Sequence, residues 1–395
     1  MLLLLATHSF QRFCPLNPWN QYFAATSCSK PNKTKIRLES TGEVGTPLPT
    51  QRLITSSFMS IRSELRRVVE DRETLSLDEA SNLMQRILSE EVPETELAAL
   101  LGAMAGRGET AAEIAGFAQA LRAKATTLPL TDEERSTIVD TCGTGGDGSG
   151  TFNISTAAAL VAAAAGAKVA KHGNRAITSR CGSADVLEAL GIPTELEPAA
   201  AADALRRHGF CFLLAPAHHP ALKKLMPIRR ALGVRTVLHV LGPLLNPAGV
   251  RRQVMGVYAA RLVAPVAEAM ALLGTTHAMV VHGHQGLDEL ALSGPSEVAI
   301  VNNESVTLEQ VSPDSLDLEK APLTALTGGD AQANAAILRA IFAGERGPRR
   351  DVVLLNAAAV LVVAGRAQDL TAGIALAAET IGSGAVTRLI DRLQS

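Results

Sequence analysis

The sequence predicts an α/β fold, with a small N-terminal helical domain followed by a larger domain built on a central, mostly parallel sheet. Apolar residues recur with a helical period from about residue 58 to 127. From residue 128 to 395, short runs rich in β-branched residues alternate with helical runs, as in βαβ units. Aromatic residues make up only 3% of the chain, while Gly is plentiful, which favours closely packed helices over an aromatic-rich all-β domain.

The first 57 residues differ in composition from the remainder. They carry six Lys or Arg against Glu39 and Glu43, with many Ser, Thr, Asn and Pro, so their net charge is +4 and about −6 remains for the rest. Few acids with basic and hydroxyl residues are typical of an organelle transit peptide. We expect a plastid (chloroplast stroma) address first and a mitochondrial one second; an extension without any address is the alternative.

The helical domain, residues 58–127, is predicted from caps and an apolar stripe. Ser76-x-x-Glu79 and Thr110-x-x-Glu113 are capping boxes. Leu97, Leu100, Leu101 and Met104 fall on one helix face. Residues 216–233 interrupt the later alternation with polar and basic helical sequence, and we expect them to return to this domain.

The α/β domain, residues 128–395, contains six expected strands: Ile138–Thr141, Lys168–Lys171, Cys211–Leu214, Thr236–Val240, Val254–Val257 and Ala278–His282. Val352–Leu355 fits a strand or a helix. Helices are expected between several of them, at Thr156–Ala165, Ser183–Leu190 and Ala264–Leu273. In such folds, ligands bind at the carboxyl ends of the strands.

A glycine cluster, Gly143-Thr-Gly-Gly-Asp-Gly148, follows the first expected strand and precedes a helix. Backbone N–H groups and the helix dipole make such a turn an anion site. A dinucleotide fold would need an acid at the end of the next strand, where Lys171-His172 stands instead; NAD is disfavoured, and the basic residue leaves NADP open. A P-loop would need Lys at Ser149, so a nucleoside triphosphate is also disfavoured.

Two further groups of residues keep alternative interpretations. Asn153-Ile154-Ser155-Thr156 can cap the following helix, or bind phosphate oxygens, or in the case of Ser155 ligate Mg²⁺. Asp288-Glu289, on a loop after an apolar strand, can be a general acid/base couple, a magnesium ligand set or a pair of acids on a solvated turn.

Charge and cysteine usage exclude several classes of partner. The net charge of −2 argues against nucleic acid, and no apolar run reaches the ~18–20 residues that span a bilayer. The five cysteines form no CxxC and no metal-binding spacing, so we predict reduced thiols and no structural zinc.

Taken together, the motifs GTGGDGSGTFNIST, KHGNR, CGSAD, HHPALKKLMPIRRALGVRT, GPLLNPAG and GLDELAL resemble those of the anthranilate phosphoribosyltransferase family of tryptophan biosynthesis. The resemblance runs from about residue 60 to the C-terminus and suggests the plant or algal plastid type. It implies a nucleoside phosphorylase/phosphoribosyltransferase-like fold. It also implies transfer of the phosphoribosyl group of 5-phosphoribosyl diphosphate (PRPP) to the amino group of anthranilate, with release of diphosphate.

The resemblance also implies roles for individual residues. Two Mg²⁺ ions are expected, one at Ser155 and one at Asp288 with Glu289. Anthranilate would contact Gly143, Asn174, His219 and Arg229, with Arg230 as the rival of Arg229 for the carboxylate; no general base is assigned. PRPP would be bound by Gly143, Gly146, Asp147, Thr151, Asn153, Ile154, Ser155, Thr156, Lys171, His172, Gly173, Asn174, Arg175, Ser179 and Ser183.

Some positions depart from the family pattern: Leu245 stands where many relatives have Thr, His239 replaces Asn, and His284-Gln285 precede the acidic pair. The rival activities are a pyrimidine nucleoside phosphorylase on the same fold and a non-catalytic nucleic-acid-binding relative. The expected partners are the two small substrates, with no nucleic acid and no membrane, and the resemblance suggests a homodimer.

Overall fold

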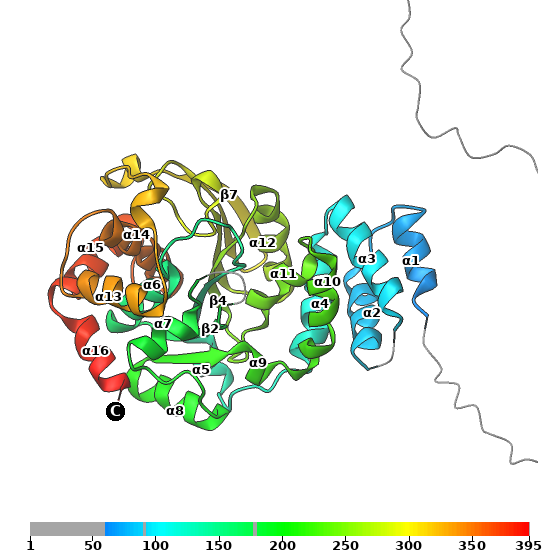
Figure 1. Ribbon diagram of the computed structural model, residues 1–395, viewed down its shortest axis with the longest axis horizontal. Helices are drawn as coiled ribbons and strands as arrows, with labels where there is room; N and C mark the ends of the chain where they lie inside the picture. Colours follow the sequence, from blue (N-terminus) through cyan, green and yellow to red (C-terminus); the bar gives the residue numbers. More distant parts are fainter. Residues whose placement is uncertain (1–59, 90–91, 177–179, 395) are drawn as a thin grey trace, which may run out of the picture. The chain divides into compact units, whose positions relative to one another are not determined.

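The computed structural model describes residues 60–89, 92–176 and 180–394 (Figure 1). The proposed leader, residues 1–57, and Ser179 lie outside the described residues. The described part begins with four helices, α1 (Arg62–Val69), α2 (Leu77–Ser89), α3 (Glu94–Arg107) and α4 (Ala111–Arg122). Seven strands and further helices follow, as the sequence predicts for an α/β fold with a helical N-terminal domain.

Local capping explains where two of these first helices begin. Ser76 N donates to Glu79 at 2.9 Å, and Glu79 N donates back to Ser76 Oγ at 3.3 Å, so the capping box before α2 is confirmed. Thr110 and Glu113 form the same pair before α4. The predicted stripe on α3 is buried, with Leu97 to Met104 at most 3% exposed at the four stripe positions.

The sheet contains the strands β1 (Ile138–Gly143), β2 (Lys168–Gly173), β3 (Phe210–Leu214), β4 (Arg252–Gly256), β5 (His277–His282), β6 (Ser296–Asn302) and β7 (Ser305–Val311). Their order across the sheet is β3-β2-β1-β4-β5-β6-β7. The five strands from β3 to β5 are parallel, and β6 and β7 add an antiparallel hairpin at one edge. Along the chain, β2 and then β3 are added on one side of β1, and β4 is added on the other side. This reversal makes the carboxyl edge around β1 and β4 the expected ligand site.

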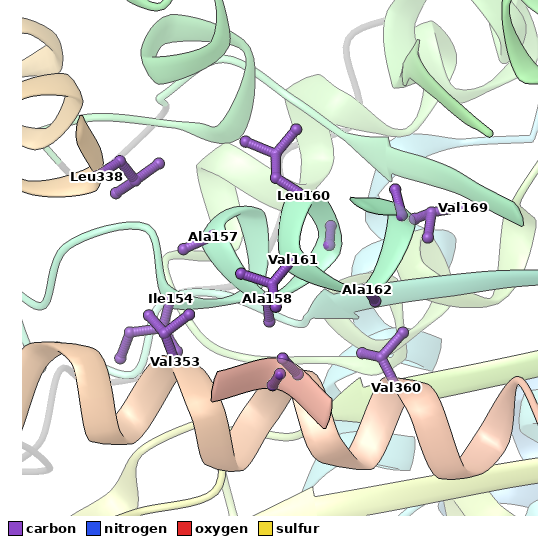
Figure 2. Packing of buried hydrophobic residues seen from close by; sticks show 14 of the residues in the cluster. Ile154, Ala157, Ala158, Leu160, Val161, Ala162, Val169, Leu338, Val353 and Val360 are labelled. Atoms are coloured by element: carbon purple, nitrogen blue, oxygen red, sulfur yellow. The ribbon is translucent and has the colours of Figure 1, made fainter. Parts of the chain in front are cut away.

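One face of the sheet is covered by α6 (Ile154–Ala164), the helix that follows the glycine loop. Figure 2 shows Ile154 and Val161 of α6 next to Val353 and Val360 of α14 (Pro348–Val363). The small side chains of α6 are almost all fully buried, which allows α14 to approach closely. The same face carries α7 (Ser183–Ala189), α13 (Ala331–Phe342), α15 (Leu370–Gly382) and α16 (Ala385–Leu393).

The opposite face packs against α12 (Val263–Leu272) and the helical domain, so both share one apolar cluster. α10 (Met226–Leu232) contacts α3, and Lys224 Nζ donates to Leu88 O at 2.8 Å, so part of the stretch 216–233 lies against the first helices. Other helices are α5 (Asp132–Thr137), α8 (Pro198–His208), α9 (Ala215–His218) and α11 (Val237–Leu241).

Among the described residues, no single helix has both the length and the hydrophobicity to cross a membrane. Within the same residues, α15 and α16 pass such a test of length and composition only when taken together, and they are bent by 67° relative to each other.

One prediction about elements is wrong, and one ambiguous run is resolved. The expected strand Thr236–Val240 is wrong, because Val237–Leu241 forms α11, which begins where Thr236 N donates to the His239 ring at 3.2 Å. The ambiguous run Val352–Leu355 is helical, within α14. The hairpin of β6 and β7 was not predicted; most residues of β7 are exposed, so its sequence has no continuous apolar run like those of the parallel strands.

Candidate functional site

The glycine loop joins β1 to α6 at the carboxyl edge of the sheet. Its glycines Gly145, Gly146, Gly148 and Gly150 all have φ between 66° and 75°, a conformation that L side chains rarely adopt. The start of the loop is hydrogen-bonded to the end of β4, since Thr144 N donates to Gly256 O at 2.9 Å. The loop therefore presents exposed backbone beside the N-terminus of an 11-residue helix, as an anion site requires.

The acidic pair lies directly behind this loop. Asp288 Oδ2 accepts from Gly145 N at 2.7 Å, and Glu289 Oε1 accepts from Ser155 N at 3.1 Å. Glycine at the end of β4 permits this approach, because a Cβ on Gly256 would lie 1.6 Å from Asp288 O. The predicted acidic pair and Ser155 are thus neighbours, although 134 positions separate Glu289 from Ser155.

Burial makes the charged forms of Asp288 and Glu289 costly. Desolvation, and then the nearby carboxylate of Asp147, raises the pKa of Asp288 well above its usual range. Desolvation and the charge of Asp288 raise the pKa of Glu289 in the same way. Lys171 supplies one compensating cation; its side chain is 1% exposed, and Nζ donates to Thr141 O at 2.7 Å and Ser155 Oγ at 3.2 Å.

A divalent cation fits this donor set. Hydroxyl and carboxylate oxygens are ligands that Mg²⁺ prefers, and it commonly uses one or two protein oxygens together with phosphate and water. Within the parts of the chain that the structure describes, no three His, Cys, Asp or Glu side chains form a complete metal site. The Ser155 hydroxyl and the two carboxylates suit a metal that completes its coordination with phosphate oxygens and water.

The second predicted loop, Lys171 to Arg175, begins inside β2, because the strand continues to Gly173. Its backbone is bonded to a side chain of β1, since His172 N donates to Asp140 Oδ1 at 3.1 Å. Asn174 Oδ1 accepts from Arg175 N at 2.8 Å, which forms a local turn. Gly173 lies close to Phe212 and to Ser183, the first residue of α7.

Arg175 does not point its guanidinium into this cluster in the described structure. Two of its nitrogens donate to Glu188 at 2.7 Å, and one also donates to Glu195 at 2.8 Å. The side chain is 44% exposed, so these ion pairs are screened by solvent.

The predicted acceptor side lies on α10 and the segment before it. Arg229 is half-buried, which lowers its pKa, whereas Arg230 is exposed and bonds Met226 O of its own helix. His219 is 3% exposed, and its ring meets that of His172 edge-on, with centroids 5.2 Å apart. His219 of the acceptor side therefore touches His172 of the donor side.

The residues that depart from the family pattern have structural roles. His239 accepts the Thr236 N–H at the start of α11. Leu245 is fully buried in the cluster shared with the helical domain. His284 is exposed and bonds Ser293 Oγ at 3.1 Å, and Gln285 takes a left-handed conformation in the turn.

Asp140 is a buried residue that the sequence analysis did not assign to the site. Its carboxylate is fully buried and accepts from His172 N and from Gln253 Nε2, at 3.1 and 3.3 Å. Desolvation raises its pKa, and the charge of Lys171 opposes that effect. A buried acid inside a predicted strand was a sequence signal for such a role.

Arg235 and Tyr258 also border the site, outside the predicted set. The Arg235 guanidinium lies 4.2 Å from the Tyr258 ring centroid, and one of its nitrogens donates to Gly146 O. Tyr258 N donates to Thr144 Oγ1 at 3.1 Å. Both residues therefore hold the outer side of the glycine loop.

Comparisons with known proteins identify the family. Residues 63–125 match the model "Glycosyl transferase family, helical bundle domain", and residues 135–387 match "Glycosyl transferase family, a/b domain". Anthranilate phosphoribosyltransferase of Chloroflexus aggregans is 49% identical over 337 residues, covering 85% of this chain and 97% of that protein. The corresponding protein of Desulfatibacillum aliphaticivorans is 45% identical over 331 residues, covering 84% and 97%.

Solved structures agree. Anthranilate phosphoribosyltransferase from Thermus thermophilus superposes with a TM-score of 0.78 at 44% identity, covering 84% of this chain and 98% of that one. The Saccharomyces cerevisiae enzyme, solved in complex with PRPP and Mg, gives a TM-score of 0.74 at 29% identity, covering 84% and 96%. Since relatives of this identity match almost along their whole length, the chain belongs to the anthranilate phosphoribosyltransferase family.

Proposed function

We propose that this chain transfers the phosphoribosyl group of PRPP to the amino group of anthranilate, giving N-(5-phosphoribosyl)anthranilate and diphosphate. The observation that carries the proposal is the convergence of Ser155, Lys171 and Asp288-Glu289 on the glycine loop. A sugar with phosphate at both ends needs such a cradle of N–H groups, a cation and metal-binding oxygens.

The donor substrate would lie along the glycine loop and the N-terminus of α6. Lys171 is buried against Ser155, so its charge is available where the diphosphate would approach the helix. When bound, Mg²⁺ would supply positive charge to the departing diphosphate. We propose two ions, one held by Ser155 and one by Asp288 with Glu289.

The acceptor would lie on the side of Arg229 and His219. A planar carboxylate on a ring suits the guanidinium fork better than a lysine ammonium. Partial burial of Arg229 would strengthen that pairing, because a hydrogen bond between charged groups is stronger where less water competes for them. His219 is neutral at pH 7, since burial lowers its pKa to about 4, so it would form an uncharged wall for the aromatic ring.

The chemistry then needs little acid–base catalysis. Breaking the C1–O bond builds positive charge on the ribosyl ring and negative charge on diphosphate, which the loop N–H groups and Lys171 meet where it develops. An arylamine is neutral and nucleophilic at pH 7, so positioning is the other large contribution, worth up to ~7–11 kcal/mol.

One assay tests this function. Protein is mixed with PRPP, Mg²⁺ and anthranilate, and the loss of anthranilate fluorescence is followed together with diphosphate release. We expect both signals to appear in equal amounts. Phosphorolysis of thymidine without consumption of anthranilate would instead identify a pyrimidine nucleoside phosphorylase.

Arg229→Ala tests the acceptor assignment. Removal of the guanidinium should raise KM for anthranilate at least about tenfold, because a charge-assisted pair of hydrogen bonds is lost, and should leave KM for PRPP nearly unchanged. Arg230→Ala is the matched control, because Arg230 is exposed and donates to Met226 O of its own helix. A change confined to the PRPP KM would contradict the assignment.

Asp288→Asn tests the metal assignment. The variant keeps the shape of the side chain but removes one of the two carboxylates that would hold the metal, so the Mg²⁺ concentration for half-maximal activity should rise by about tenfold. Titration of activity with Mg²⁺ after chelation measures this. Unchanged metal dependence would remove Asp288 from the ligand set.

Localisation and assembly are further proposals. The composition of residues 1–57 supports a plastid transit peptide, with a mitochondrial address as the second choice, and the matched family regions begin only at residue 63. Fusion of residues 1–57 to a fluorescent protein tests the address. The homodimer suggested by the family resemblance is tested by light scattering of the protein that starts near residue 58.

A further inference from the structure

A second glycine-containing segment, residues 327–330, borders the glycine loop. Thr151 and Thr327 form an isolated antiparallel bridge, and Gly328 N donates to Gly150 O at 2.9 Å. A Cβ on Gly328 would lie 2.7 Å from the backbone of Phe152, so only glycine fits there. This segment leads directly into α13, whose side chains therefore reach the start of α6.

Asn334 of α13 is the side chain that makes this connection. It is 1% exposed; its Oδ1 accepts from Gly329 N at 2.7 Å, and its Nδ2 donates to Asn153 Oδ1 at 2.8 Å. Asn153 Nδ2 then donates to Cys181 O at 3.3 Å. A backbone donor at one end and a backbone acceptor at the other fix the direction of both amides.

These hydrogen bonds keep the Asn153 side chain from capping α6. Asn153 occupies the N-cap position of α6, where an asparagine ordinarily accepts from the N–H two or three residues ahead. Its side chain makes no such bond; the bonds to Asn334 and to Cys181 O orient the amide instead. Of the two N–H groups that such a cap could take, that of Ser155 donates to Glu289 Oε1 at 3.1 Å, so the bond that Asn153 does not make leaves the N–H of Thr156 for a ligand.

We propose that Asn334 is a positioning residue for PRPP, which holds the Asn153 side chain away from the N-terminus of α6 and so keeps that end open for the diphosphate. The inference rests on the proposed function, because it assumes that the diphosphate binds at this helix end. Asn334 itself acts through Asn153 and does not touch the substrate.

Asn334→Asp tests the proposal with almost no change in size. The new carboxylate can still accept from Gly329 N, but it cannot donate to Asn153 Oδ1, so two acceptors face each other. Asn153 must rotate, and its oxygen is then free to cap α6. We expect KM for PRPP to rise about tenfold or more, with KM for anthranilate changed less than about twofold.

Leu338→Ala is the control for a merely structural role. Leu338 lies one turn further along α13 and is fully buried in the apolar cluster (Figure 2). Its truncation should lower Tm while KM for PRPP stays within about twofold of the wild type. Equal increases of this KM in both variants would overturn the proposal.

A double-mutant cycle provides the sharpest readout. In an Asn153→Ala background there is no amide to hold, so Asn334→Asp should add less than about twofold to the PRPP KM. An undiminished effect in that background, or no effect in the wild-type background, would overturn the proposal. If Asn334→Asp fails to fold, Asn334→Ala carries the same expectations. Failure of the proposed function is distinguishable, because the wild-type protein would then not consume anthranilate.

Discussion

Arg235 illustrates, at the scale of a single residue, how the loop conformation is maintained. Its guanidinium stacks on Tyr258 and donates to Gly146 O. Because a trans peptide places C=O and N–H on opposite sides, this contact also orients the N–H of Asp147 away from Arg235. A side chain outside the predicted set thus controls the direction of a backbone donor in the glycine loop.

Arg235→Ala should therefore weaken binding of the donor substrate. Loss of the charge-assisted hydrogen bond, discounted for exposure to solvent, should cost about 1–2 kcal/mol, or roughly five- to thirtyfold in kcat/KM for PRPP. Steady-state kinetics with PRPP varied will measure this. Arg261→Ala is the control, since Arg261 lies 5.9 Å from the same ring centroid. An equal loss in the control would show that the stacked tyrosine, and not the loop contact, is responsible.

His219 predicts a pH dependence of stability. Its pKa is about 4 in the folded protein, against an ordinary value of 6.5, because burial disfavours the charged ring. The unfolded chain binds the proton below pH 6.5 and the folded protein does not, so stability is lost as pH falls from 6.5 to 4.

The measurement compares wild type with His219→Gln, which lacks the titrating ring. Between pH 7.5 and pH 5.0, the free energy of unfolding of the wild type should fall by about 2 kcal/mol more than that of the variant. Urea unfolding at the two pH values gives the difference. Parallel losses in both proteins would contradict a buried, neutral His219.

Among the elements, the end of β4 leaves room for the loop that carries Asp288 and Glu289. The end of β4 must be glycine, because a Cβ on Gly256 would overlap Asp288 O at 1.6 Å. Gly256→Ala should therefore displace the acidic pair and raise the Mg²⁺ requirement several-fold.

Gly382→Ala is the matched control for this change. Gly382 ends α15, and a Cβ there meets nothing within 4 Å, so the substitution should be neutral or stabilise the protein by about 0.4–1 kcal/mol. Metal titration and thermal unfolding of both variants test the prediction. Normal metal dependence of the β4 variant would contradict the tight packing of Asp288 on this strand.

The elements also show what a single sequence can predict. The parallel strands were predictable because each is a short, buried, apolar run bounded by glycine or polar residues. Thr236–Val240 has the same composition, yet it folds as a helix because its first turn is capped by His239 and its apolar side chains complete the cluster below α3 and α4. Tertiary packing decides such cases, and five residues carry too little periodicity to reveal it.

At the scale of the whole described part, the site is assembled from segments far apart in the chain. The order of the strands brings the loops after β1, β2 and β5 to one edge, which the alternation of elements predicts. The pairing of Asn334 with Asn153, 181 positions away, could not be predicted. Polar residues in helical sequence usually face solvent, and only the packing of α13 beside α6 shows that this one is buried.

A crystal structure of the protein with PRPP and Mg²⁺ would show directly whether the glycine loop binds the diphosphate. We expect the diphosphate to lie against the backbone of the glycine loop and the first turn of α6. Metal ions should lie at Ser155 Oγ and at Asp288 with Glu289. A diphosphate bound elsewhere, with the glycine loop making no contact to it, would contradict the account.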